Sequence, residues 1–296
     1  MRKNRWIVAS LAAFVLAQGQ APMTDRSKQL SQERIESESA EAVKDPTAKP
    51  VTEAVAAVTE TRTAVQYLDQ NRPDQARDAL SRAIVKSNIV SSMHPMMTLV
   101  PVSFNLQVTD TIASDATLKR VTEEVKKLVD SGQYQAARPL LRDLASEIDV
   151  TTVNLPIATY PSSLRSAASL IDRGKVAEAK SQLLSALHSL VINERIIPLP
   201  VVRAQALVEE VNRQVLAKKV DKEQASIFLS DADQQLALAE KLGYGTRKQD
   251  FSDLRASIQE IKRSIRLDQQ PQTFIARVKS DLQSLKERIW NAVAAV

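Results

Sequence analysis

The sequence predicts a mainly α-helical protein: a bundle of repeated helical hairpins with short extended or β segments between them. Three observations support this fold class. The 296 residues include only five glycines and 4% aromatic side chains, and good helix formers such as Ala, Leu, Gln, Glu, Lys and Arg dominate. One hairpin-like segment occurs three times. The last third of the chain has apolar residues at helical spacings of three and four.

The first residues are typical of an export signal. Residues 1–5 are cationic, and residues 6–17 form an apolar run of twelve. A helix needs about 20 residues to cross a bilayer, so this run is too short for an ordinary span. We therefore expect a signal peptide at residues 1–19, cleaved after Ala17 or Gly19, and a periplasmic location. The alternative is an uncleaved N-terminal membrane anchor. The chain has no cysteine, so the fold is indifferent to redox conditions.

The net charge of +5 gives no evidence for nucleic-acid binding. Arg2, Lys3 and Arg5 supply three of these charges, which leaves +2 after signal cleavage, and a nucleic-acid site needs a concentrated basic surface. We expect no nucleic-acid partner and no stable membrane insertion of the mature protein. Residues 20–50 are polar and bounded by prolines, which predicts either a mobile arm or a solvated helix.

The repeated segment predicts helical hairpins. In each copy two bulky residues and an Asp precede Asn71, Gly132 or Gly174, which tolerate positive φ and should end the first helix. A small Ala follows five residues later and allows close helix packing, and a Leu four residues further on fills the shared face. Unequal offsets of 61 and 42 residues exclude a regular solenoid. The copies are YLDQNRPDQARDALSRAI (67–84), LVDSGQYQAARPLLRDLA (128–145) and LIDRGKVAEAKSQLLSAL (170–187).

Each hairpin is followed by a β-branched, proline-containing stretch. These stretches, 88–108, 148–161 and 191–202, are predicted to be extended, because proline is excluded from helix interiors but accepted at strand edges and ends. They could pair as a small sheet. Helices should then begin near Ser114, Pro161 and Pro200.

The C-terminal third predicts three amphipathic helices. Gly243 and Gly245 break the first from the second, and Pro271 precedes the third. We expect a single helical domain over residues 51–296, with hairpin repeats at 51–218 and the helical trio at 219–296. The apolar faces are Ala225, Phe228, Leu229, Ala232, Leu236 and Ala239; Phe251, Leu254, Ile258, Ile261 and Ile265; and Phe274, Val278, Leu282, Leu285 and Ile289.

The segment SSMHPMMTLVPV (91–102) contains three of the five methionines and one of the two histidines. Met and His are soft metal ligands, but Met96 and Met97 should point to opposite faces of a strand. We predict no metal site. The equivalent stretches after the other hairpins lack Met and His, so the shared role is structural packing. A pliable apolar surface is a second reading, and its candidate client or ligand contacts are Met93, Met96, Met97, Leu99, Phe104 and Tyr244.

Signatures of enzymes are missing from the sequence. It contains no glycine-rich phosphate loop and no G-x-S-x-G elbow. His94 and His188 are far apart, and we expect His188 to be a partly buried helix residue. Adjacent Glu209 and Glu210 diverge on a helix. We therefore predict a protein without catalytic activity or cofactor.

Further single features have ordinary interpretations. Tyr244, between two glycines, should fasten the helix break to the core, although it could instead close over a ligand. A basic cluster lies near a helix end, where the negative pole of the helix dipole favours positive charge. We expect its residues, Lys262, Arg263 and Arg266, to form a solvated face.

Two further segments carry a family resemblance. They are RIIPLPVVRAQALVEE (195–210) and AEKLGYGTRKQDFSDL (239–254). Together with the exported start, these segments resemble the YfdX family of exported bacterial stress proteins. The resemblance runs from about residue 51 to the C-terminus. The resemblance implies a helical, homo-oligomeric periplasmic protein linked to heat, acid or other envelope stress. It also implies chaperone-like or small-molecule-binding behaviour, and it brings no catalytic residues.

Three functions follow as hypotheses. The first is chaperone-like protection of unfolded or stress-damaged proteins by non-catalytic binding. The second is binding of apolar small molecules in a pocket between the hairpins and the C-terminal helices. The third is an enzyme of unrecognised type, which would require a cleft that gathers several carboxylates or a histidine.

Overall fold

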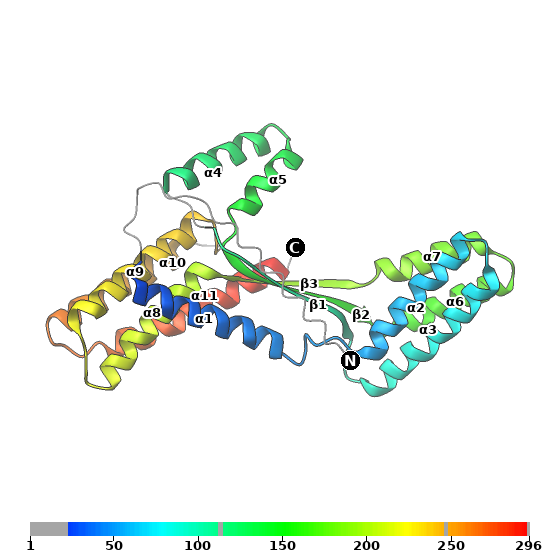
Figure 1. The fold of residues 1–296 in the computed structure, drawn as a ribbon, viewed down its shortest axis with the longest axis horizontal. Helices are drawn as coiled ribbons and strands as arrows, with labels where there is room; N and C mark the ends of the chain where they lie inside the picture. Colours follow the sequence, from blue (N-terminus) through cyan, green and yellow to red (C-terminus); the bar gives the residue numbers. More distant parts are fainter. Residues whose placement is uncertain (1–22, 112–114, 246–247, 295–296) are drawn as a thin grey trace. The chain divides into compact units, whose positions relative to one another are not determined.

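The computed structural model describes residues 23–111, 115–245 and 248–294, and this part of the chain contains eleven helices and three strands (Figure 1). The predicted mainly α-helical fold is confirmed. The predicted signal peptide and the alternative membrane anchor lie outside the described residues. The helices are α1 Asp25–Lys44, α2 Thr52–Asp69, α3 Pro73–Met93, α4 Asp115–Asp130, α5 Tyr134–Asp143, α6 Tyr160–Asp172, α7 Val176–His188, α8 Leu199–Leu216, α9 Lys222–Lys241, α10 Lys248–Arg266 and α11 Gln272–Ala294.

The chain divides into two compact units. Unit 1 takes its described residues from 1–40, 107–149 and 195–296, and unit 2 takes them from 41–106 and 150–194. The hairpin copies are therefore distributed over both units: the first and third belong to unit 2, and the second belongs to unit 1. This partition differs from the expected one, in which hairpins and C-terminal trio were consecutive parts of one domain.

Unit 2 is a four-helix bundle made from two hairpin copies. Helix α2 packs on α3 and α7, and α6 packs on α3 and α7, so the four helices form a closed ring. Its core is rich in alanine, which lets the helices approach closely. The ring of Tyr160 is fully buried, and its hydroxyl lies 2.9 Å from the Thr61 hydroxyl. Burial raises the pKa of Tyr160 to about 12. The buried alanines are Ala64, Ala76, Ala79, Ala83, Ala167, Ala168, Ala179 and Ala186.

The predicted helix ends of the hairpins are confirmed. Asn71, Gly132 and Gly174 have φ values of 57°, 74° and 73°, the left-handed conformation expected one residue beyond a helix. In each copy the next backbone N–H donates to the carbonyl of the first repeat residue, five positions earlier. The pairs are Arg72 to Tyr67 at 2.9 Å, Gln133 to Leu128 at 2.8 Å and Lys175 to Leu170 at 2.9 Å. The same bond at the same repeat position shows that the three copies are equivalent in structure.

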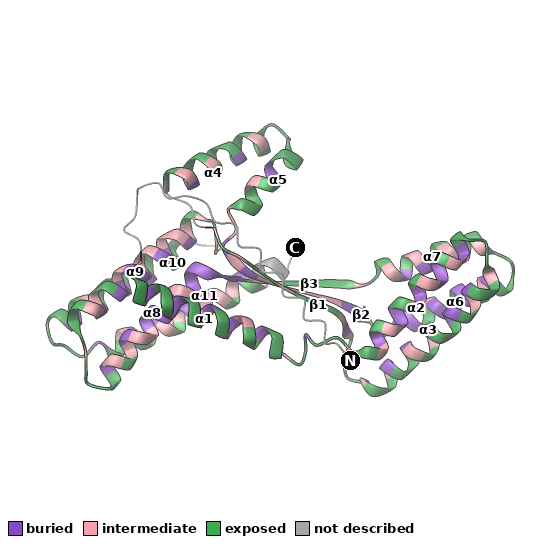
Figure 2. Cartoon of the chain, in the orientation of Figure 1, coloured by how far each residue is buried: buried purple, intermediate pink, exposed green. Residues whose placement is uncertain are grey.

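Unit 1 contains a second closed ring of four helices. Helix α8 packs on α9, α9 on α10, α10 on α11, and α11 on α8. The predicted apolar faces of the C-terminal trio are buried, apart from the partly buried Phe274, and Figure 2 shows these buried stripes along the helices. Helix α9 begins at Asp221, whose carboxylate accepts a bond of 3.0 Å from the Gln224 backbone N–H, as an N-cap residue does. The trio therefore needs α8 to complete its core.

The N-terminal segment is a helix with one buried face, and neither a mobile arm nor a fully solvated helix describes it. Leu30 belongs to the core cluster of α8–α11, and Ile35 and Glu38 are also buried. The sequence reading missed this face because small and polar residues such as Ser27 and Ser31 occupy much of it.

The three extended segments form one sheet in the order β1-β2-β3, with β1 Leu99–Thr109, β2 Glu147–Pro156 and β3 Val191–Pro198. The predicted small sheet is confirmed. Pro101 lies in the edge strand β1, and Pro156 and Pro198 end their strands, as the missing N–H of proline requires. Some boundaries were wrong: residues 88–93, expected to be extended, are the last turns of α3, and residues 160–161 and 199–202 already belong to α6 and α8.

Candidate functional site

Helix α3 carries a row of exposed apolar side chains on its outer face. Val85, Ile89 and Met93 follow one another at intervals of four, which places them on one side of the helix. All three are exposed, Met93 to 60% of its surface. Met96 follows in the turn after the helix and is 93% exposed. We call Val85, Ile89 and Met93 the α3 stripe.

The edges of the α3 stripe are polar and held in place. Arg82 pairs with Glu60 at 2.8 Å, and Arg165 donates to the Asn88 side chain at 3.2 Å. An apolar strip with a polar rim is typical of a surface that contacts other molecules.

The predicted contact residues do not act as one group. Met93 and Met96 are exposed, as a contact surface requires, whereas Met97 packs inward on Ala54, Val90 and Val100. Leu99 and Phe104 lie in β1 and are half-buried. The prediction that Met96 and Met97 diverge on a strand is wrong, because both precede β1.

Sequence reasoning missed Val85 and Ile89. The expected extended segment began at residue 88, so the helical register was cut before Ile89. The signal was nevertheless present: Val85, Ile89 and Met93 share a spacing of four, which α3 preserves to its last residue.

Tyr244 belongs to unit 1 and fastens its chain there. Its hydroxyl donates to the Glu147 carboxylate at 2.6 Å and accepts the Ser146 backbone N–H at 2.8 Å. Burial, followed by the charge of Glu147, raises the pKa of Tyr244 well above its usual value. Gly245 beside it has φ 90°, and a Cβ there would approach the Phe251 ring to 3.0 Å. This geometry matches the anchoring alternative for Tyr244.

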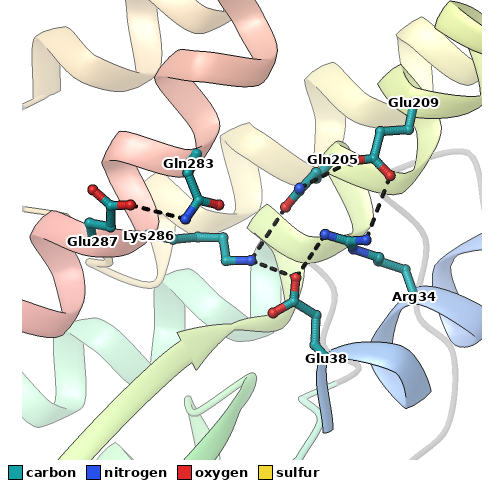
Figure 3. Close-up of polar contacts among 7 residues, drawn as sticks. All are labelled: Arg34, Glu38, Gln205, Glu209, Gln283, Lys286 and Glu287. Atoms are coloured by element: carbon teal, nitrogen blue, oxygen red, sulfur yellow. Dashed lines mark hydrogen bonds and ion pairs between the residues drawn. The ribbon is translucent and has the colours of Figure 1, made fainter. Parts of the chain in front are cut away.

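A buried polar cluster joins α1, α8 and α11 in unit 1 (Figure 3). The Lys286 ammonium lies 2.6 Å from the Glu38 carboxylate, and the exposed fractions of the two side chains are 10% and 6%. The Arg34 guanidinium adds a second contact to Glu38 at 3.0 Å. Gln205 accepts from Lys286 at 3.4 Å and donates to Glu209 at 3.1 Å. Side chains engaged in this way hold α1 to the bundle.

A surface groove lies between α9 and α10, and its volume is about 500 Å³. Lys222, Lys262, Arg263 and Arg266 line it beside Leu229 and Ile265. Two of the cations are engaged, Lys222 with Asp268 and Lys262 with Ser230, both at 2.6 Å. The groove therefore combines basic and apolar side chains, and it lies between two C-terminal helices and not between the hairpins and those helices, where the sequence places the hypothetical pocket.

Among the described residues, neither histidine lies in a group of potential metal ligands. The backbone of His94 caps the end of α3, and His188 is the exposed last residue of α7, not a partly buried one. Within residues 23–111, 115–245 and 248–294, no group of three His, Asp or Glu side chains is placed to hold a metal ion. In the same part of the chain, no helix combines the length and apolar character that a bilayer span requires.

Comparison with known proteins identifies one family. The family model for the YfdX protein matches residues 57–196. Among solved structures, YfdX of Salmonella Typhi is similar to the chain with 15% sequence identity and a TM-score of 0.38, over 51% of this chain and 94% of the other. No curated protein matches the chain. The matched residues include all three hairpin copies, while the two segments that carried the sequence resemblance lie almost entirely beyond them. Residues 57–196, just under half of the chain, therefore match the YfdX family.

Proposed function

We propose that this protein is an exported, non-catalytic binding protein that protects unfolded or stress-damaged proteins in the periplasm. The α3 stripe is the observation that carries the proposal. The match of residues 57–196 to the YfdX family supports a role in the stress response, which the sequence resemblance implies. The cationic N-terminal segment supports export.

The chemistry of the stripe suits varied apolar clients. Methionine is flexible and polarisable, so it adapts to partners of different shape. Covering exposed apolar surface gains about 25 cal/mol per Å², so a few side chains of this size give weak, reversible contacts. On the rigid helix, Val85 and Ile89 would form the fixed part of the contact surface. Met93 and Met96 would form its adaptable part.

The test is suppression of client aggregation under heat or acid. The purified protein should slow aggregation of a model client in a dose-dependent way. A variant with Val85, Ile89, Met93 and Met96 all replaced by serine should lose most of this protection, because the apolar contact is gone.

The matched control replaces exposed apolar residues of unit 1. Leu216 and Leu267 are 67% and 51% exposed, and their replacement by serine should leave protection unchanged. Both variants must keep the circular dichroism of the parent protein. Absence of protection by the parent protein in molar excess would refute the chaperone function, and equal protection by both variants would refute the role of the stripe.

The small-molecule hypothesis has a different readout. A saturable rise in melting temperature with one class of apolar compounds would support it. The α9–α10 groove combines basic side chains with Leu229 and Ile265, so the screen should include apolar compounds that carry a negative charge.

A further inference from the structure

Among the described residues, the second hairpin copy, α4–α5, does not pack on another hairpin as the other two copies do. In unit 2 the first and third copies pack face to face through α2 on α7 and α3 on α6. The described residues of α4 and α5 make their main helix contacts with each other. This inference concerns a surface other than the α3 stripe and does not depend on the proposed function.

The face that the other copies bury is exposed on α4–α5. Leu141 is 51% exposed, whereas its repeat equivalents Leu80 and Leu183 are fully buried. Val129 is 39% exposed, whereas its equivalents Leu68 and Ile171 are buried.

Two further positions refine this comparison. Tyr134 is exposed, whereas its equivalent Val176 packs against the core of unit 2. Ala137, which faces the other helix of its own hairpin, is buried as in the other copies. The hairpin itself is therefore intact, and only its outward face is uncovered.

The packing of the first and third copies is reciprocal. Asp69 of the first copy pairs with Lys180 of the third at 2.5 Å, and Asp172 of the third pairs with Arg77 of the first at 2.8 Å. Counted from the first residue of each copy (67, 128 or 170), both pairs join position three of one copy to position eleven of the other. Such an arrangement has the symmetry of a two-fold interface, in which the same surface serves both partners.

The second copy has the same two charges at the same two positions. Asp130 stands at repeat position three and Arg138 at position eleven. Both are exposed, and within the part of the chain that the structure describes neither forms an ion pair with another side chain. A second α4–α5 hairpin, turned by a two-fold axis, would supply an arginine for each aspartate.

We propose that α4–α5 is a homodimerisation surface. Two copies of this chain pack their α4–α5 hairpins face to face, α4 of each on α5 of the other, into a four-helix bundle like that of unit 2. Leu141 and Val129 of both chains fill its core, and Asp130 of each chain pairs with Arg138 of the other. A second copy of the chain is the occupant that matches both the apolar and the charged positions.

Sedimentation velocity over a wide range of concentrations tests the proposal with the full chain. The parent protein should dimerise, and Leu141→Asp should raise the dissociation constant at least about a hundredfold, because each dimer loses two central contacts and gains two buried charges. Leu141→Ser should weaken the dimer less. Leu267→Asp, the same change at a leucine of unit 1 that is also 51% exposed, should leave the dimer intact.

Charge reversal tests the reciprocal pairing. Asp130→Arg or Arg138→Asp alone should weaken the dimer, because each places like charges opposite one another twice. The double variant should recover most of the affinity. A parent protein that stays monomeric at all concentrations overturns the proposal, and so does a dimer that resists Leu141→Asp. If the protein is a monomer whose α4–α5 amides resist hydrogen exchange, its own chain covers the face.

Discussion

The two four-helix bundles of this protein reach the same closed ring by different routes. The bundle of unit 2 pairs two copies of one hairpin, packs many alanines in its core and places ion pairs between the copies on its surface. The bundle of unit 1 contains four dissimilar helices with large side chains such as Phe228, Phe251 and Ile258 in its core. It also has a fifth helix, α1, held by a buried ion pair.

This difference shows what a repeat can and cannot do alone. Each hairpin has an internal face, where its two helices pack at the small Ala, and an outer apolar face, which only a second hairpin buries. In unit 2 the partner comes from the same chain. The α4–α5 hairpin has the Asp, Ala, Arg and Leu of the first copy at the same repeat positions, so whatever covers it should obey the same rules.

The largest effect is expected where unit 1 buries charge. Glu38→Gln removes the carboxylate that faces Lys286 at 2.6 Å and Arg34 at 3.0 Å. Loss of one partner leaves the other charge buried without compensation, so we expect the free energy of unfolding of unit 1 to fall by about 3 kcal/mol. The first measurable sign should be faster hydrogen exchange along α1, because Glu38 holds this helix to α8 and α11.

Glu41→Gln is the matched control. Glu41 lies on the same helix, one turn further on, and is exposed. Its replacement should change stability by less than about 0.5 kcal/mol. If the two variants exchange equally fast along α1, the buried pair does not hold the helix.

An intermediate effect is expected from enlarging the alanine core of unit 2. Ala167 in α6 is fully buried between close helices. Ala167→Leu adds volume to a packed core, so we expect a loss of about 1–3 kcal/mol. Ala177→Leu on the exposed side of α7 should be close to neutral. Urea unfolding with a probe in unit 2 measures both, and equal midpoints would mean that the alanines do not set the helix spacing.

Local rules made much of the fold predictable. The positive φ of Asn71, Gly132 and Gly174 followed from residue type and repeat position, and the buried faces of α9 to α11 followed from spacing alone. The start of α8 at Leu199 lies within one residue of the start expected near Pro200, because Pro198 ends β3. These features depend on neighbours in the chain, which the sequence displays directly.

Features that depend on distant partners could not be predicted in this way. Leu80 and Leu141 occupy the same repeat position, yet of these two only Leu80 is buried, because in the part of the chain that the structure describes only its hairpin packs on a second hairpin. Glu38 looks like an ordinary solvated residue until Lys286, 248 residues later, lies opposite it. The α3 stripe was half recognised: Met93 and Met96 stood out by residue type, while Val85 and Ile89 required the true end of α3.

The smallest effect is expected at the surface pairs that join the hairpins of unit 2. Asp172→Asn breaks the pair with Arg77, whose two side chains are 54% and 37% exposed. Exposed pairs contribute about 0.2–1 kcal/mol, so the loss should be small and should shrink further at high salt. A double-mutant cycle with Arg77→Gln isolates the interaction from other effects of each substitution. A coupling energy above about 2 kcal/mol would mean that charge, and not the apolar face, joins the two hairpins. In that case the Asp130–Arg138 pairs should contribute more to the affinity of the α4–α5 dimer than Leu141 does.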